Sequence, residues 1–391
     1  MNDTKSINPS LEYMVLAIWL IVCAIAIFLS LKTGRTVTGN YYIAAHHWLT
    51  NVNLYSGTGG GFIYLPQSAI LYVPLSLIPF WLSEIIWRIA NWMAIFYGLS
   101  FWLKLTMQGD LRNYGKYLLL FSLLFIPVAF SSLRNGQMNM ILVSGSLWFF
   151  WAMLREKLWI ASLILVVAVF LKPTMIVLCL LAFCIYPRIR LSIIILLVIF
   201  LALPFIVNIH WEYVISQYQA AINSLIISSK VGSDHVTSWA QLFNFLSLFS
   251  HNDIPRVTQN LLRVIFAILT LVFAIKAKKN YSQFSGYILL FSLFACYLML
   301  FNPRTENNDY ILLATSISMF SVFFMKQKEY LNLTLMVLFS FGLLFSSNIS
   351  MLLTPSNQSW FTPFIALLCY VYLLVAIGIR YIPYRKKERL I

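Results

Sequence analysis

The chain consists largely of long apolar runs separated by short segments that carry its charges. The first run, residues 14–31, extends over 18 residues, which is close to the roughly 20 that a helix needs to cross the hydrocarbon core of a bilayer. A cleaved signal has a shorter apolar region of about 7–15 residues, so we expect this run to persist as a first membrane span. With 61% hydrophobic and only 10% charged residues, the composition excludes an ordinary soluble domain.

Eleven further apolar runs follow the first one. Together they predict an all-α polytopic membrane protein of about twelve spanning helices, forming one integral membrane domain over residues 1–391. Several runs are shorter than a perpendicular span requires, so neighbouring runs can share a tilted or broken helix. The further runs cover residues 86–107, 117–131, 139–154, 158–171, 173–187, 191–209, 261–275, 282–301, 310–325, 331–353 and 362–380.

The five cysteines all lie inside apolar runs. This position indicates small buried side chains rather than a disulfide framework, and no spacing typical of a metal site is present. We therefore expect no metal and no cofactor apart from the substrates themselves. The cysteines are Cys23, Cys179, Cys184, Cys296 and Cys369.

Basic residues cluster in the short turns between the runs and set the expected orientation. The net charge is +15, and cytoplasmic Lys and Arg explain this excess better than a nucleic-acid partner does. The basic C-terminus, residues 380–389, is placed in the cytoplasm, and alternation through twelve spans brings the N-terminus and the short basic turns to the same side. We expect a multi-pass protein of a plasma membrane, such as a bacterial inner membrane. The turn residues are Lys5, Lys104, Arg112, Lys116, Arg155, Lys157, Arg188, Arg190, Lys276, Lys278, Lys279, Lys326 and Lys328.

Two long segments then fall on the extracytoplasmic side, residues 32–85 and about 210–260. Within the first, residues 62–82 are apolar but contain three prolines, which disfavour a continuous helix. A span there would also move the basic turns to both sides of the membrane. We therefore predict a bent juxtamembrane or re-entrant element, with a proline-kinked full span as the alternative.

Polar residues on this outer side suit an anionic ligand that carries hydroxyl groups. Charges flanked by apolar sequence are costly and commonly mark sites or pathways. Guanidinium and ammonium groups bind phosphate oxygens, amides bind sugar hydroxyls, and aromatic rings can stack on a sugar or form an interfacial belt. Simple snorkelling of the cations and a solvated turn at residues 302–310 remain alternatives. The candidates are Arg134, Lys172, Arg304, Asn135, Gln137, Asn139, Tyr41, Tyr42, Tyr55, Tyr64, His46, His235, Asp234, Glu306 and Asp309.

One ordered series of motifs resembles a known family. The segment Arg134–Asn139 reads Arg-Asn-Gly-Gln-Met-Asn and is followed by an apolar run, a basic turn, a second run and Lys172-Pro173. This order resembles glycosyltransferase family 87, whose pattern is G-Q-x-N, span, basic turn, span and K-P. The similarity covers most of residues 38–185. Its upstream elements are Tyr41-Tyr42-x-Ala44-Ala45, Leu54-Tyr55, Phe62-x-Tyr64-x-Pro66 and Pro74-Leu75.

The resemblance implies a GT-C-like bundle with juxtamembrane helices in the first outer loop. It also implies transfer of a sugar, commonly mannose, from a polyprenyl phosphate at a site facing away from the cytoplasm. Family members usually carry an aspartate a few residues before the tyrosine pair, where this chain has residues 37–40 without an acid. In the mannosyltransferase branch, two histidines stand where this chain has Asn308 and Asp309.

From these features we expect a hexosyltransferase, with mannose as the first candidate, that uses a polyprenyl-phosphate donor and a glycolipid or glycan acceptor among membrane lipids. A general base is needed near the acceptor hydroxyl; Asp309 is the first candidate, Glu306 the second and Asp234 the third. Rival hypotheses are a lipid-linked glycan transporter or flippase, a glycan polymerase or ligase, and a non-catalytic scaffold. The predicted phosphate contacts are Arg304, Lys172 and Arg134, and the predicted hydroxyl contacts are Gln137, Asn139 and Tyr42.

Overall fold

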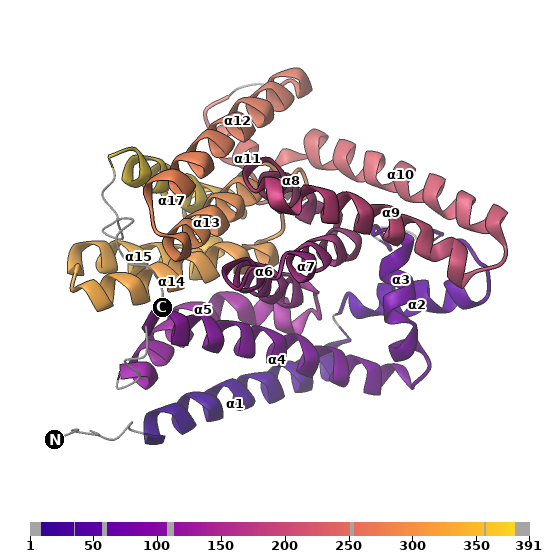
Figure 1. Cartoon of the computed structure of the whole chain (residues 1–391), viewed down its shortest axis with the longest axis horizontal. Helices are drawn as coiled ribbons and strands as arrows, with labels where there is room; N and C mark the ends of the chain where they lie inside the picture. The colour runs from indigo at the N-terminus through magenta and orange to yellow at the C-terminus, as the bar shows by residue number, and fades with distance from the viewer. Residues whose placement is uncertain are drawn as a thin grey trace.

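The computed structural model describes residues 9–34, 36–56, 61–107, 113–250, 254–355 and 357–379. Within them the backbone forms α-helices joined by turns and short 3-10 segments, and these residues contain no β-strand (Figure 1). Seven helices are long and apolar enough to cross a membrane, or up to nine if each of two bent helix pairs counts as one span. The predicted all-α polytopic membrane fold is confirmed, whereas the count of twelve spans stays a prediction.

Each of the twelve apolar runs lies mainly in helix. This agreement follows from the hydrocarbon environment, in which a helix satisfies its own backbone hydrogen bonds. The helices are α1 Pro9–Thr33, α2 Thr38–Leu49, α3 Pro66–Ser76, α4 Phe80–Met107, α5 Tyr114–Arg134, α6 Asn139–Leu154, α7 Leu158–Leu171, α8 Ile176–Ile185, α9 Arg190–Val207, α10 Trp211–Asp234, α11 Leu242–Leu246, α12 Arg256–Asn280, α13 Gln283–Phe301, α14 Ile311–Gln327, α15 Tyr330–Leu344, α16 Ser346–Leu353 and α17 Phe361–Gly378.

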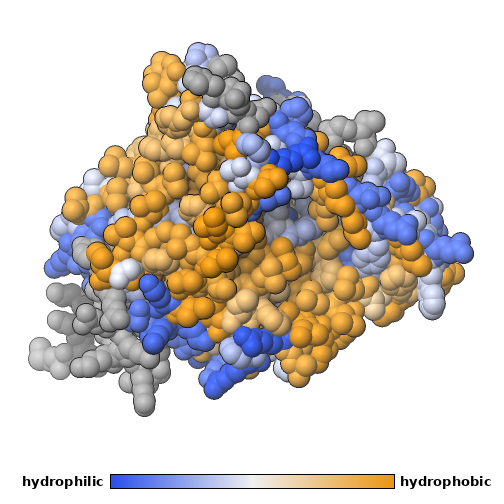
Figure 2. All heavy atoms as spheres, turned by 90° about the horizontal axis from the view of Figure 1, so that it is seen from above, coloured by the Kyte–Doolittle hydropathy of each residue, from blue (hydrophilic) through white to orange (hydrophobic). Residues whose placement is uncertain are grey.

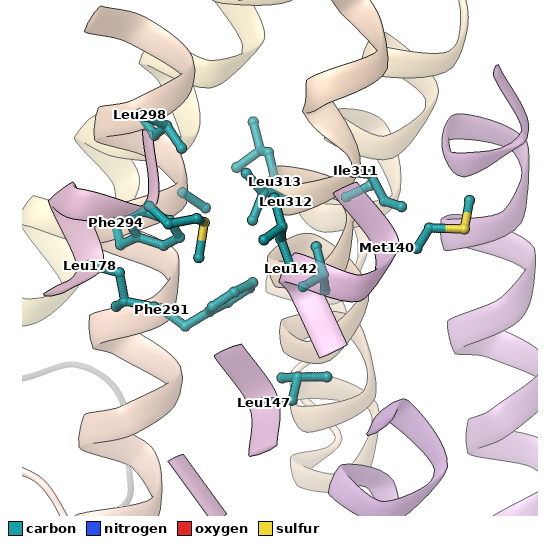
Figure 3. Close-up of a cluster of buried hydrophobic side chains, with 14 of the residues drawn as sticks. Met140, Leu142, Leu147, Leu178, Phe291, Phe294, Leu298, Ile311, Leu312 and Leu313 are labelled. Carbon is teal, nitrogen blue, oxygen red and sulfur yellow. The ribbon is translucent and has the colours of Figure 1, made fainter. Parts of the chain in front are cut away.

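Helices α13 and α14 form the centre of the bundle. In each of them 89% of the most apolar window is buried, compared with 17% for α12 and 22% for the span that contains α9. Figure 3 shows Leu142 of α6, Phe294 of α13 and Leu312 of α14 gathered in one apolar cluster. The ends of α6, α13 and α14 are therefore fixed by a common core.

The outside of the bundle is apolar, as a lipid-facing surface should be. Large aliphatic side chains are exposed along α1, α9 and α12. On the face drawn in Figure 2, apolar residues cover most of the middle and hydrophilic residues gather toward the edges. Such a continuous apolar surface would promote aggregation in water, and it agrees with a multi-pass membrane protein.

The proline-containing run 62–82 is bent. Helix α3 begins at Pro66 and meets α4 at an angle of 114°, with the break at residues 77–79. Pro66 occupies the first helical position, where its missing N–H costs nothing. The bend agrees with the prediction; its depth in the membrane stays a prediction.

The second long segment, residues 210–260, contains helix α10 of 24 residues, which no long apolar run had indicated. The sequence hid this helix because its buried residues, Val214, Gln217 and Ala221, alternate with polar ones and form no long apolar run. Near its start, Gln217 Oε1 accepts a hydrogen bond from the Leu54 amide at 2.9 Å. Helix α10 therefore rests on the segment that follows α2.

The run 331–353 is bent, because α15 and α16 meet near Phe345 at 67°, and the pair can still form one broken span. One expectation about the cysteines was wrong. Cys184 is exposed, whereas the other four cysteines are buried. Cys184 lies near the end of α8, where the helix leaves the core. Among the basic residues used for orientation, Lys5, Arg112 and the C-terminal cluster lie outside the described residues.

Close packing of α10 against the loop after α13 yields a stability prediction. A methyl group added to Gly232 would lie 2.3 Å from the Pro303 carbonyl oxygen, and overpacking of this kind costs about 1–3 kcal/mol. We expect Gly232→Ala to lower the melting temperature in detergent, followed by intrinsic fluorescence. In the control Gly145→Ala, the new methyl group meets only Ile164, at 3.7 Å, so no decrease is expected. Equal melting temperatures for Gly232→Ala and wild type would contradict the contact.

Candidate active site

Three side chains from three helix ends meet at the centre of the site. Lys172 lies between α7 and the 3-10 turn that precedes α8, Asn139 begins α6, and Asp309 lies in the turn before α14. Lys172 Nζ lies 2.6 Å from Asp309 Oδ1 and 2.8 Å from Asn139 Oδ1. Asn139 Nδ2 donates to Asp309 Oδ1 at 3.0 Å. We call these residues the central triad.

The chain folds this way locally because proline follows Lys172. A residue before proline is disfavoured in the α region, and Lys172 is extended, with φ −141° and ψ 110°. Helix α7 therefore stops at Leu171. Since the backbone turns at this point, the lysine side chain is directed to the neighbouring ends of α6 and α14.

The ion pair in the triad is largely removed from water. The side chains of Lys172 and Asp309 are 19% and 6% exposed. Burial alone would lower the pKa of Lys172, but the Asp309 carboxylate 2.6 Å away raises it, and the pKa stands above its usual value. Lys172 therefore stays protonated at neutral pH. The second oxygen of Asp309 accepts the Glu306 amide at 3.0 Å, so both carboxylate oxygens are engaged.

Glu306 is the accessible carboxylate of the same turn. Gln137 Nε2 donates to Glu306 Oε2 at 2.8 Å, and the other end of that amide accepts from Asn139 at 2.7 Å. Glu306 is exposed, in contrast to buried Asp309. The structure thus brings both predicted acids to one place and gives them different surroundings.

A hollow opens at the central triad. Its polar lining lies beside apolar side chains from α6, α13 and α14, and Figure 3 shows Leu142, Leu298 and Leu312 in this region. The hollow has room for about one water molecule and is mostly apolar, and the central triad supplies polar groups to its lining. The lining residues are Asn139, Leu142, Lys172, Thr174, Met175, Leu298, Met299, Asn302, Asp309 and Leu312.

Tyrosines from the first outer segment border this group. The hydroxyls of Tyr41 and Tyr64 are 3.3 Å apart, and Tyr55 donates to the Tyr64 carbonyl at 2.6 Å. Burial raises the pKa of the Tyr64 phenol, and the nearby Lys172 ammonium partly opposes that rise. Three of the four predicted tyrosines therefore form one cluster, which lies within electrostatic reach of the triad.

Arg304 lies in the loop that also holds Glu306, but it points toward α10. Its Nη1 donates to Ser228 Oγ at 2.9 Å, and its guanidinium lies 4.7 Å from the centre of the Trp239 ring. No carboxylate of the described residues forms an ion pair with it. Arg304 thus presents a positive charge that no acid in this part of the chain neutralises.

Other predicted residues are not brought to the triad. Asp234 pairs with Arg256, whose guanidinium holds the pKa of that carboxyl below its usual value. Tyr42 donates to the Ile78 carbonyl at 3.0 Å and lies against His46, which is exposed. His235 is exposed at the end of α10. Within the described chain, no hydrogen bond or ion pair joins these side chains to Asp309.

Arg134 and Asn135 take part in this region through their backbone carbonyl groups. The Arg134 carbonyl accepts from Arg88 at 2.8 Å, and the Asn135 carbonyl accepts from the Val37 amide at 2.9 Å. Sequence reasoning missed Arg88 and its partner Glu84 as parts of this region. The sequence did contain a signal for this pair, namely an acid and an arginine four residues apart in an apolar helix. Charged residues within membrane segments are rare and usually have a function. Over the described residues, no group of three or more His, Cys, Asp or Glu side chains could hold a metal ion.

Comparison with known proteins identifies the family. The model of glycosyltransferase family 87 matches residues 62–303, so the chain belongs to this family, as the motifs predicted. A segment of 115 residues is 29% identical to the polyprenol-phosphate-mannose-dependent alpha-(1-2)-phosphatidylinositol pentamannoside mannosyltransferase of Mycobacterium tuberculosis (strain CDC 1551 / Oshkosh). That segment is 29% of this chain and spans only 26% of the relative's length. The family match includes Asn139 and Lys172 and ends before Glu306 and Asp309.

The buried ion pair yields a second stability prediction. Removing one partner of a buried pair leaves an uncompensated charge and costs about 3–5 kcal/mol. We therefore expect Lys172→Ala to lower the melting temperature markedly. The control Arg188→Ala breaks a pair with Glu156 whose side chains are 77% and 78% exposed, and such pairs contribute only about 0–1 kcal/mol. Similar small shifts for both variants would contradict a buried, stabilising Lys172–Asp309 pair.

Proposed function

We propose that this protein transfers a mannosyl residue from polyprenyl phosphate mannose to a glycolipid or glycan acceptor on the extracytoplasmic face of the membrane. One observation carries the proposal: an exposed carboxylate, Glu306, lies three residues before Asp309 of the buried Lys172–Asp309 pair, whose side chains line a small hollow. Membership of glycosyltransferase family 87 supports a sugar transfer. The printed name of the mycobacterial relative supports a polyprenyl-phosphate mannose donor.

In this proposal Glu306 is the general base and Asp309 is an organising residue. A base must have a free oxygen within reach of the acceptor hydroxyl. Asp309 is buried and accepts from the Lys172 ammonium, from Asn139 and from a backbone amide. Glu306 is exposed and forms no ion pair among the described residues; its side chain accepts from amide side chains and from the Asp309 backbone N–H. This reverses the order suggested by the sequence, in which Asp309 came first.

The reaction follows from these positions. The acceptor oxygen attacks the anomeric carbon and its proton passes to Glu306, while the bond from that carbon to the phosphate oxygen breaks and the polyprenyl phosphate leaves with the electron pair. Negative charge develops on the phosphate, so a nearby cation lowers the barrier. We assign this role to Arg304, because the Lys172 ammonium is occupied by Asp309 at 2.6 Å. The Arg304 guanidinium lies against Ser228 and Trp239, so the donor phosphate would bind on the α10 side of this loop. We assign the sugar hydroxyls to Gln137, which contacts Glu306, and to Tyr64.

The orientation of the site is part of the proposal. Lys326 Nζ donates to the Thr106 carbonyl at 2.7 Å, and Lys278 Nζ donates to the Ile185 carbonyl at 2.6 Å. These contacts join basic turns at the helix ends remote from the central triad. Basic turns favour the cytoplasm, which supports a triad that faces away from it and a cytoplasmic position for both termini.

A transport function is less well supported. A transporter places its polar residues along a path through the membrane, typically near the midplane between two repeats. Below the triad, α13 and α14 are tightly buried and the space between α6, α13 and α14 is filled by apolar side chains (Figure 3). The charges thus lie at one end of the bundle, where a surface reaction would use them.

The base assignment can be tested by Glu306→Gln. The amide keeps the shape of the side chain and one acceptor oxygen but cannot accept a proton, so we expect kcat to fall by about 10²–10⁴-fold. The assay uses proteoliposomes, a short-chain polyprenyl phosphate carrying radiolabelled mannose, and lipid extract of the producing membrane as acceptor. Full activity of Glu306→Gln would transfer the base role to Asp309. Transfer only of preassembled glycans would indicate a polymerase or ligase.

The phosphate contact can be tested by Arg304→Gln. Losing a hydrogen bond to a charged group costs about 1.5–3 kcal/mol, which corresponds to about a 10–100-fold lower kcat/KM for the donor. Arg256→Gln is the matched control, because that guanidinium is occupied by Asp234, and its kcat/KM should remain close to wild type. Equal effects of the two substitutions would contradict a specific phosphate contact at Arg304.

A further inference from the structure

A second buried ion pair lies outside the central triad. Glu84 and Arg88, four residues apart on α4, are 3% and 1% exposed, and Arg88 Nη1 lies 3.4 Å from Glu84 Oε1. Burying two charges is costly unless further hydrogen bonds satisfy them. The contacts of this pair therefore indicate what it does for the fold.

Arg88 uses its guanidinium to hold the end of α5. Its Nη2 donates to the Arg134 carbonyl at 2.8 Å and its Nε donates to the same oxygen at 3.3 Å. Nη2 also contacts Ser30 Oγ at 2.5 Å and Thr36 Oγ1 at 3.0 Å. A planar guanidinium can make this fork of bonds, whereas a lysine ammonium cannot.

The turn between α5 and α6 is held at three consecutive carbonyl groups. Arg88 binds the Arg134 carbonyl, the Val37 amide binds that of Asn135 at 2.9 Å, and Trp87 Nε1 donates to that of Gly136 at 2.8 Å. Gly136 has φ +67°, a conformation that favours glycine. The backbone of this turn therefore has little freedom.

This turn leads directly into the site. Gln137, which contacts Glu306, is the next residue, and Asn139, which contacts Asp309 and Lys172, begins α6. A displacement of the turn would move both amides away from the two carboxylates. The geometry of the site thus depends on groups that touch none of its ligands.

Glu84 extends the same arrangement to a second part of the site. Its Oε1 accepts a hydrogen bond from the Thr38 hydroxyl, and its Oε2 accepts from Ser30 at 3.4 Å. Thr38 begins α2, one turn before Tyr41, whose hydroxyl lies 3.3 Å from that of Tyr64. One ion pair on α4 is therefore bonded both to the start of the tyrosine helix and to the turn that carries the amides.

We propose that Glu84 and Arg88 form a positioning pair that holds the 134–137 turn, and with it Gln137 and Asn139, in register with Glu306 and Asp309. The predicted effect on turnover depends on the proposed function. The predicted hold on the turn depends only on the hydrogen bonds to its backbone. Neither side chain contacts the hollow, so neither is a catalytic residue.

The test compares Arg88→Lys with wild type in two measurements. Lysine keeps the charge beside Glu84 and loses the fork to the Arg134 carbonyl. Hydrogen exchange of the peptide covering residues 134–139 should become faster, and kcat for the mannosyl donor probe should fall by about 10²-fold, the size expected for a misplacement of about 1 Å. KM for the donor should change much less than kcat, because the proposed phosphate contact, Arg304, is untouched.

Two further variants keep the test decisive. Arg190→Lys is the matched control: this arginine also donates to two backbone carbonyls, those of Phe183 and Cys184, at a turn on the far side of α8 from Lys172. It should change neither measurement. If Arg88→Lys does not fold, Trp87→Phe replaces it. This change keeps an aromatic ring beside Tyr41 and Tyr72, removes the hydrogen bond to the Gly136 carbonyl, and should also speed exchange of the turn.

A double-mutant cycle separates positioning from general destabilisation. If Arg88 acts through the turn, Arg88→Lys should lower kcat much less in a Gln137→Ala background than in the wild type. Unchanged exchange at 134–139, unchanged kcat, or fully additive effects would each overturn the proposal. If wild-type protein transfers nothing from the donor probe, the proposed function fails, and faster exchange in Arg88→Lys would still support the hold of the pair on the turn.

Discussion

The buried contact between Lys172 and Asp309 is the constraint on which the site depends. It joins the end of α7 to the start of α14, and Asn139 adds the start of α6. Neither charge could remain at this depth alone, because an unpaired buried ion is strongly destabilising. The polar side chain at each of the three helix ends therefore needs the other two as partners. The apolar cluster beneath them fixes the distance between the helices (Figure 3).

The same contact gives two acids that are three residues apart, Glu306 and Asp309, different surroundings. Asp309 is buried and paired with Lys172, whereas Glu306 is exposed and accepts hydrogen bonds from neutral groups. One short turn thus holds a buried, paired carboxylate and an exposed one, and the proposed function uses the exposed carboxylate as its base.

Much of this arrangement could be predicted from the sequence. Apolar runs leave few polar residues, so Gln137, Asn139, Lys172 and Asp309 stood out, and alternation of the spans assigned them to one end. The directions of side chains could not be predicted: Arg304 turns to α10, and Asp234 is bound by Arg256. Helix α10 was missed because amphipathic sequence produces no long apolar run, and the Glu84–Arg88 pair was overlooked because burial is a property of the folded chain.

The turn between α5 and α6 limits which sequence changes such a protein can tolerate during evolution. Every peptide carbonyl from Arg134 to Gly136 is bonded to another element, and the first residue of α6 contacts the buried ion pair. Adding a single residue there would rotate α6 by about 100° and carry Asn139 to the wrong face. Substitutions elsewhere can accumulate gradually. Any insertion or deletion in this turn, however, displaces the whole of α6, so the length of the turn is either kept or the activity is lost.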